Sequence, residues 1–181
     1  MAKSQRARSL PPAPLSDPTR LAAYSAEHLA YEVRVLFLAI GSGRATLGSN
    51  HQSLLVFLKN ARVEAFANHL RNLVCFLYPD QFTVMRDDVC AHHFIDAADA
   101  LQAWTSARGA LSDTLRNAKA RADKEMAHLT TQRLEPSDAG RDWDMIALGD
   151  EVRTVLKAFV AAADTRRLSP TVNQAIPTGP L

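Results

Sequence analysis

Apolar residues recur every three or four positions through four long stretches of the chain, separated by short polar or proline-containing segments. This spacing places the apolar side chains on one face of an α-helix. Ser16, Asp17 and Pro18 offer a capping hydroxyl and a first-turn proline, and Gly41 ends that first stretch. The predicted long helices run from Ser16 to Gly41, from Ser49 or Asn50 to Tyr78, from Ser106 or Ser112 through Leu129, and from Trp143 to about Ala163.

The second of these helices is apolar around much of its circumference, so we expect it to lie at the centre of the fold. Residues 79–105 are less regular, and "IDAADALQAW" predicts one further short helix that packs on the others. No segment shows the sustained two-residue alternation of a β-strand. The pattern therefore predicts an all-α fold, an up-and-down bundle of four or five helices.

Seven of the nine prolines lie near the two ends of the chain, where they disfavour long helices. We therefore expect a disordered, basic and proline-rich tail at 1–15, the bundle at 16–168, and a flexible tail at 169–181. No window approaches the roughly 18 consecutive apolar residues of a membrane span, and the N-terminal residues lack the apolar core of a signal peptide. Two cysteines are too few for a disulfide framework. These features predict a cytoplasmic protein without a membrane partner.

Four polar residues share one side of the third long helix, namely Asn117, Arg121, Lys124 and His128. Arg121 and His128 are seven residues apart, almost two full turns, so their side chains point the same way. This strip borders the predicted core stripe, as expected for a groove between helices or a subunit interface. A structural interpretation pairs Arg121 with an acid such as Glu64. A chemical interpretation makes the imidazole a base beside a cationic clamp for phosphodiester cleavage.

The segment "RADKEMAH" resembles the Arg-x(4–6)-His motif of the HEPN (higher eukaryotes and prokaryotes nucleotide-binding) superfamily, with six residues between Arg121 and His128. Together with "ARVEAFANHLRNLVCFLYPD", "RDDV" and the remainder of "RADKEMAHLTTQRL", it is similar to a bacterial branch of such proteins over roughly residues 50–165. Members are all-α bundles, and many are metal-independent ribonucleases that act as toxins or in antiviral defence.

The resemblance implies that Arg121 and His128 are catalytic and that Asn117 and Lys124 bind the substrate. It also implies that the motif helices of a homodimer meet in one groove, that no cofactor or metal is used, and that an antitoxin protein is a possible partner. The net charge of +2 is too small to indicate RNA binding on its own, so RNA or a nucleotide enters as a partner only through the motif.

Four further polar residues support the predicted site: Glu64, His69, Arg71 and Asp123. His69 falls within the apolar sector of the second helix, where a polar group needs a partner. One interpretation is a polar network that ties the second helix to the third. The other is an extension of the Arg121–His128 site, with Glu64 orienting Arg121.

Other patterns predict less. "CAHHF" at 90–94, with Cys75, offers metal-ligand residue types without a second ligand pair at regular spacing. "GSGRATLG" at 41–48 has no preceding strand, so a connection between helices fits better than a phosphate loop. HEPN nucleases often carry Asn, Asp or His after the arginine and Tyr two residues beyond the histidine, where this chain has Ala122 and Thr130. A non-catalytic module that binds a nucleotide, RNA or a protein therefore stays open as an alternative function.

Overall fold

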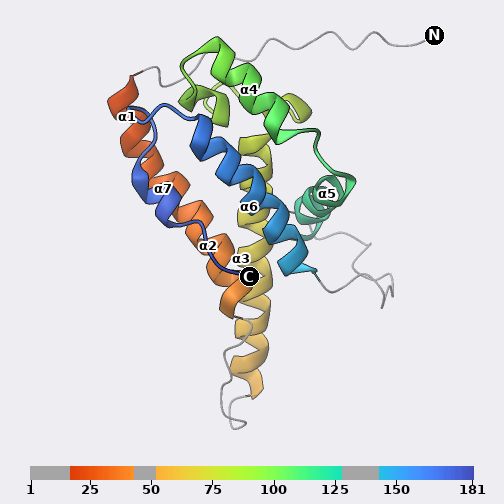
Figure 1. Ribbon diagram of the computed structural model, residues 1–181. Coiled ribbons are helices and arrows are strands. Elements are labelled where there is room, and N and C mark those ends of the chain that lie inside the picture. Colours follow the sequence, from red (N-terminus) through yellow and green to blue (C-terminus); the bar gives the residue numbers. More distant parts are fainter. Residues whose placement is uncertain (1–16, 43–51, 128–142) are drawn as a thin grey trace, which may run out of the picture.

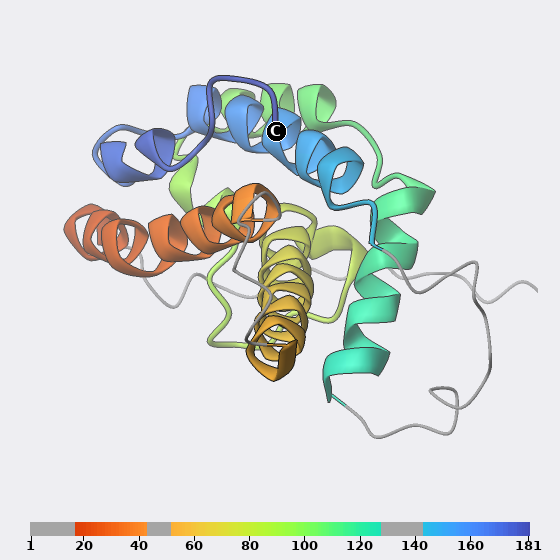
Figure 2. The same cartoon turned by 90° about the horizontal axis from the view of Figure 1, so that it is seen from below.

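The computed structural model describes residues 17–42, 52–127 and 143–181, and it confirms an all-α bundle (Figure 1). Within these residues every regular element is a helix. Seen from below, the long helix α3 stands between α2 on one side and α5 on the other (Figure 2). Among the described residues, no helix is both long enough and apolar enough to cross a membrane. The predicted tail at 1–15 lies outside the described residues.

The first predicted helix is one continuous run made of α1 (Pro18–Tyr24), a π-helical turn η1 (Ser25–Leu29) and α2 (Ala30–Gly41). The cap is the carboxylate of Asp17, which accepts a hydrogen bond from the backbone N–H of Thr19 at 2.9 Å. The sequence suggested a capping hydroxyl, but an aspartate directly before the proline serves the same purpose. Ser16 lies outside the described residues.

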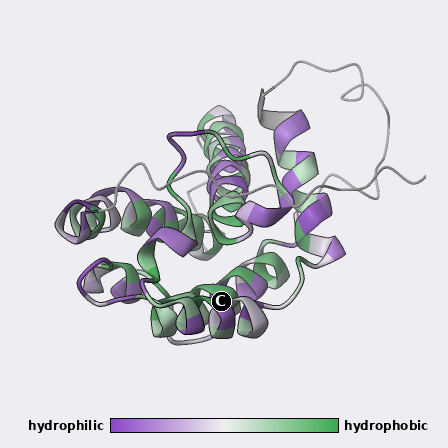
Figure 3. Cartoon of the chain, turned by 90° about the horizontal axis from the view of Figure 1, so that it is seen from above, coloured by the Kyte–Doolittle hydropathy of each residue, from purple (hydrophilic) through white to green (hydrophobic). Residues whose placement is uncertain are grey.

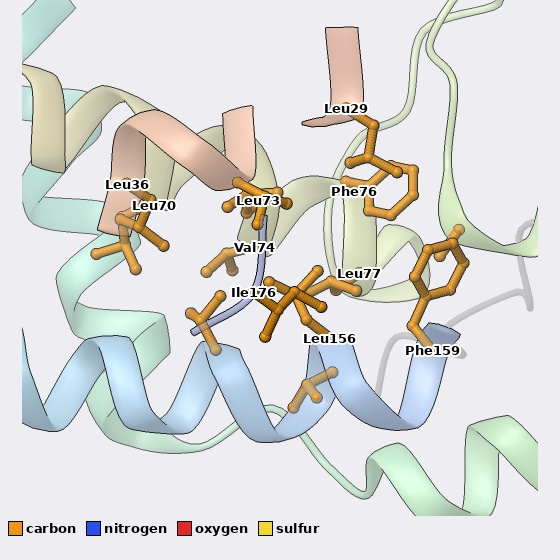
Figure 4. Close-up of a cluster of buried hydrophobic side chains, with 14 of the residues drawn as sticks. Leu29, Leu36, Leu70, Leu73, Val74, Phe76, Leu77, Leu156, Phe159 and Ile176 are labelled. Atoms are coloured by element: carbon orange, nitrogen blue, oxygen red, sulfur yellow. The ribbon is translucent and has the colours of Figure 1, made fainter. Parts of the chain in front are cut away.

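Helix α3 (Gln52–Leu77) is the centre of the fold, as predicted. Its C-terminal half carries the buried side chains, and Leu70, Leu73 and Leu77 lie in the cluster between α3 and α6 (Figure 4). Its N-terminal half extends beyond the rest of the molecule at the bottom of Figure 1. The helix ends one residue before the predicted Tyr78, and its predicted caps, Ser49 and Asn50, lie outside the described residues.

Two short 3-10 turns, η3 (Pro79–Gln81) and η4 (Ala91–Phe94), lead to α4 (Ala98–Arg108), the predicted short helix. Arg108 fixes α4 to the end of α3, because it donates a hydrogen bond to the carbonyl oxygen of Leu77 at 2.7 Å. Its guanidinium lies over the rings of Tyr78 and Trp104, at 4.5 and 5.0 Å from their centroids. A cation held by two rings and a helix-end carbonyl is a specific anchor.

Helix α5 spans Asp113–Ala127, and α6 spans Met145–Ala162. Of the two predicted starts for α5, Ser112 is correct, because its hydroxyl accepts the N–H of Leu115 at 3.0 Å. Polar residues predominate along α5, whereas α6 turns apolar residues toward the interior (Figure 3).

The flexible tail predicted at 169–181 is a folded part of the core in the structure. Helix α7 (Pro170–Gln174) places Val172 and Ile176 among the buried residues. The hydroxyl of Ser25, in the π-helical turn, accepts the N–H of Ser169 at 2.8 Å. The prediction was wrong because prolines at the ends of a short segment also permit a folded turn when apolar side chains between them reach the core.

Candidate functional site

Helix α5 has two polar borders, one on each side of its buried stripe. Leu115, Ala118 and Ala122 form the buried stripe. At about 100° per residue, Lys119 and Asp123 lie on one border and Arg121 lies on the other, while Asn117 and Lys124 point further round, toward the exposed face. The two borders therefore face different surroundings.

On the second border, Arg121 packs against the start of α6. Its guanidinium carbon lies 4.3 Å from the ring centroid of Trp143, and Trp143 meets Phe66 of α3 edge-on at 5.6 Å. Asn117 and Lys124 are exposed on the same side of the helix. The border position that the sequence predicted for these three residues therefore holds for Arg121, whereas Asn117 and Lys124 lie on the exposed side of the helix. We call them, with His128, the α5 strip.

His128 lies outside the described residues, immediately after the end of α5 at Ala127. Its predicted catalytic role stays a prediction. Glu64, the acid expected to orient Arg121, is exposed on α3.

The first border carries the Arg71–Asp123 ion pair that ties α5 to α3 and the Lys119–Asp123 pair within α5. Asp123 accepts from Arg71 Nε at 2.6 Å and from Lys119 Nζ at 2.6 Å. Lys119 also lies 4.5 Å from the ring centroid of Phe82. Partial burial by itself would raise the pKa of the Asp123 carboxyl, but the hydrogen bonds from Lys119 and Arg71 bring it below its usual range. Arg71 and Asp123 thus form the polar network between the second and third helices that one interpretation of the sequence expected.

His69 is joined to α2 and not to α5. Its Nδ1 lies 2.7 Å from Oε2 of Glu32, and the side-chain amide of Asn72 donates to the same oxygen at 3.2 Å. Tyr31 covers the imidazole edge-on at 5.5 Å between centroids. The four supporting residues therefore divide into an α2–α3 contact, an α3–α5 contact and the exposed Glu64.

A cleft of about 900 Å³ opens beside these two contacts. The walls come from the end of α1, η1, α2, α3, residues 81–90 and α5. The polar and reactive side chains that line it include Tyr24, His28, Glu32, Arg71, Asn72, Cys75, Asp87, Asp88 and Lys119. Burial raises the pKa of both Tyr24 and Cys75, so the phenol and the thiol stay neutral near pH 7.

The sequence did not reveal this cleft. Its lining comes from six segments, and helical periodicity does not tell which of them meet. For the same reason, the sequence did not indicate that Glu32 and Lys119 line a cleft. The one available signal was the irregular, mixed polar and apolar stretch at 81–90.

The "CAHHF" segment forms a turn whose groups bond to each other. His93 Nδ1 accepts the backbone N–H of Cys90 at 3.1 Å, in the manner of a cap. Burial lowers the pKa of His93 to about 4 and raises that of Cys90 to about 12. Among the described residues, no three Cys, His, Asp or Glu side chains are grouped as metal ligands.

The chain matches no protein-family model, and comparison with curated proteins and with solved structures gives no match.

Proposed function

We propose that this protein is a metal-independent endoribonuclease of the HEPN type, acting in the cytoplasm as a toxin or in defence. The observation that carries the proposal is the arrangement of polar residues around α5. Asp123 joins α5 to Arg71 of α3 and pairs with Lys119 within α5, while Arg121, Asn117 and Lys124 lie on other sides of the helix. The residues to which the motif assigns catalysis and substrate binding are thus on a different side of α5 from the Arg71–Asp123 ion pair.

The chemistry follows from the residue types. His128 removes the proton of a ribose 2′-hydroxyl, and the 2′-oxygen attacks the adjacent phosphorus. The P–O5′ bond breaks and the leaving 5′-oxygen takes up a proton from water, so the products are a 2′,3′-cyclic phosphate and a 5′-hydroxyl. Arg121 stabilises the charge that develops on the phosphate, while Lys124 and Asn117 bind the RNA backbone. The nucleophile belongs to the substrate and is already near the phosphorus, so the reaction needs no metal.

Trp143 gives Arg121 a defined position. The guanidinium carbon lies 4.3 Å from the centroid of the indole ring, and an arginine side chain carries the planar set of donors with which this residue type binds phosphate. Lysine at position 121 would keep the charge but lose the planar edge.

The test is incubation of the purified full chain with mixed RNAs in EDTA. We expect cleavage by the wild type and none by His128→Ala. His28→Ala is a matched control, because that histidine is exposed in η1 and lies along the cleft instead of on α5; it should cleave normally. Cleavage that stops in EDTA, or that persists in His128→Ala, would contradict the proposal.

The resemblance also implies a homodimer and a cognate antitoxin. A toxin that cuts cellular RNA needs an inhibitor when it is not in use, so we propose that an antitoxin covers the α5 strip. The described part of the strip is polar, which suits a partner with complementary charge.

The cleft favours a second function, a non-catalytic module that binds a nucleotide. Its volume lies in the range of small-molecule sites. Arg71 and Lys119 supply cationic donors, and the rings of Tyr24 and Phe82 supply apolar surface. This function predicts intact RNA after incubation and a melting temperature that rises with a nucleoside monophosphate. The rise should be smaller in Lys119→Gln, measured against that variant's own ligand-free value.

A further inference from the structure

The cleft carries cationic and anionic side chains on opposite sides of α3. Lys119 of α5 lines it on one side and Glu32 of α2 on the other, and α3 lies between these two helices (Figure 2). Burial is the largest cause of the raised pKa of Tyr24, and the charges of Glu32 and Asp88 add to it. Both carboxylates therefore lie near the Tyr24 phenol. We call Tyr24, His28, Glu32 and Asp88 the acidic end of the cleft.

The cations of the cleft are already paired, whereas Asp88 is not. Arg71 and Lys119 both donate to Asp123, whose charge offsets theirs. In the part of the chain that the structure describes, Asp88 forms no ion pair with a lysine or an arginine. Arg86, two residues before it, does not line the cleft. The acidic end therefore presents negative charge to a ligand.

Both carboxylates of the acidic end are held in place by other groups of the protein. Glu32 Oε2 lies 2.7 Å from Nδ1 of His69 and accepts the side-chain amide of Asn72 at 3.2 Å. Its Oε1 accepts no hydrogen bond from the described residues. Asp88 Oδ2 accepts the backbone N–H of Met85 at 2.7 Å. A ligand would not have to order these side chains, which lowers the entropic cost of binding.

Aromatic rings lie beside these carboxylates, at the π-helical turn η1. The rings of Tyr24 and His28 are 4.9 Å apart between centroids and tilted by 47°. Leu29 of the same turn and Phe76 of α3 add apolar lining. A π-helical turn within an α-helix is rare and frequently marks a functional site. Aromatic rings with carboxylates are the surroundings in which proteins bind ammonium groups.

We propose that the acidic end of the cleft binds a small organic ammonium compound, for which an aliphatic diamine is the simplest case. One ammonium group donates to the carboxylates of Glu32 and Asp88, and the Tyr24 ring adds cation–π attraction. The methylene chain covers the apolar lining. The second ammonium group meets Asp87, the third carboxylate of the cleft.

A metal ion or a phosphate fits this end less well. Within the described residues, no three Cys, His, Asp or Glu side chains are grouped as metal ligands. A phosphate would be repelled by Glu32 and Asp88, and in the second candidate function it belongs with Arg71 and Lys119 on the other side. The ammonium site is therefore separate from that function, and it does not depend on RNA cleavage.

Isothermal titration calorimetry of the full chain with 1,4-diaminobutane, at fixed ionic strength, tests the proposal. We expect saturable binding by the wild type and a dissociation constant about tenfold higher for Asp88→Asn, because the amide lacks the charge that strengthens hydrogen bonds from ammonium groups. Asp99→Asn is the matched control. Asp99 is exposed in the first turn of α4 and does not line the cleft, so this variant should bind like the wild type. Circular dichroism should be unchanged in both variants, since both side chains are exposed.

Three results would overturn the proposal. The first is no saturable binding up to about 10 mM diamine, a concentration above the dissociation constants of weak specific complexes. The second is equal affinity of Asp88→Asn and Asp99→Asn. The third is displacement of the diamine by an equal concentration of magnesium chloride, which would reduce the binding to general attraction of cations. Adenosine monophosphate should not displace the diamine, and competition between the two would contradict the separation of the two sites.

Discussion

At the residue scale, charged side chains in this fold work as connectors between helices. Asp123 holds two cations from two helices, and Arg108 joins a helix end to two aromatic rings. Each such connection restricts how neighbouring helices can pack, because a partly buried charge needs its partner. Replacing one partner should therefore cost more than replacing an exposed charge of the same type.

Asp123→Asn should lower the free energy of unfolding by about 1–2 kcal/mol at pH 7, because Arg71 and Lys119 both lose their carboxylate. The pKa of Asp123 is lowered in the folded protein, so the carboxylate stabilises the fold fully above its unfolded pKa of about 3.9. That contribution disappears as the pH falls through the lower folded value. Urea denaturation should show that the free energies of unfolding of the wild type and Asp123→Asn differ at pH 7 and approach each other at pH 3.

The control for this variant is Asp113→Asn. Asp113 is 97% exposed and 3.9 Å from Arg116, so its loss should change stability by less than about 0.5 kcal/mol. Equal losses for the two variants would show that the Asp123 pairs contribute no more than a surface ion pair.

His93 should make stability depend on pH above the carboxylate range. Its folded pKa is about 4, below the ordinary 6.5, because burial disfavours the charged ring. The unfolded chain therefore binds more protons between these values, so stability is complete above pH 6.5 and falls as the pH drops toward 4. We expect a decrease of roughly 1–3 kcal/mol over that interval, and a flatter profile for His93→Asn. Identical profiles of stability against pH for the wild type and His93→Asn would contradict the assignment of this pH dependence to His93.

At the element scale, local sequence signals predicted the helices well. Periodicity located the four long helices and the short α4, and Ser112 and Pro79 mark a start and a stop. Helix α7 was missed because a five-residue helix that begins at a proline is too short to give a periodic signal. Only the fold shows that Val172 and Ile176 reach the core. The ion pair between the second and third long helices was also missed. The sequence suggested Glu64 as the partner of Arg121, whereas in the structure Arg71 of α3 pairs with Asp123 of α5.

Helix α7 should contribute to stability as a core element. Val172→Ala should lower the free energy of unfolding by about 2 kcal/mol, since the side chain is fully buried and its removal leaves a cavity. Gln174→Ala, an exposed change in the same helix, should stay within about 0.5 kcal/mol. Urea denaturation measures both. If the two variants lost the same small amount, residues 169–181 would be the flexible tail that the sequence suggested.

At the scale of the whole molecule, the bundle presents three distinct surfaces. The α5 strip carries the motif arginine, the cleft lies on the other side of α5, and the exposed N-terminal half of α3 extends beyond the rest of the molecule (Figure 1). The three strip residues that the structure describes could be assigned to one helix from the sequence. The cleft could not be predicted, because it is assembled from segments far apart in the chain.

The most direct test of the central claim is cleavage of a DNA oligonucleotide that contains a single ribonucleotide, in EDTA. The account predicts one cut, on the 3′ side of the ribose, leaving a 2′,3′-cyclic phosphate, because only that sugar carries the 2′-hydroxyl that His128 activates. The all-DNA oligonucleotide should stay intact, and His128→Ala should cut neither. Cleavage of the all-DNA strand, a requirement for added metal, or an intact ribonucleotide after prolonged incubation with the wild type would contradict the account.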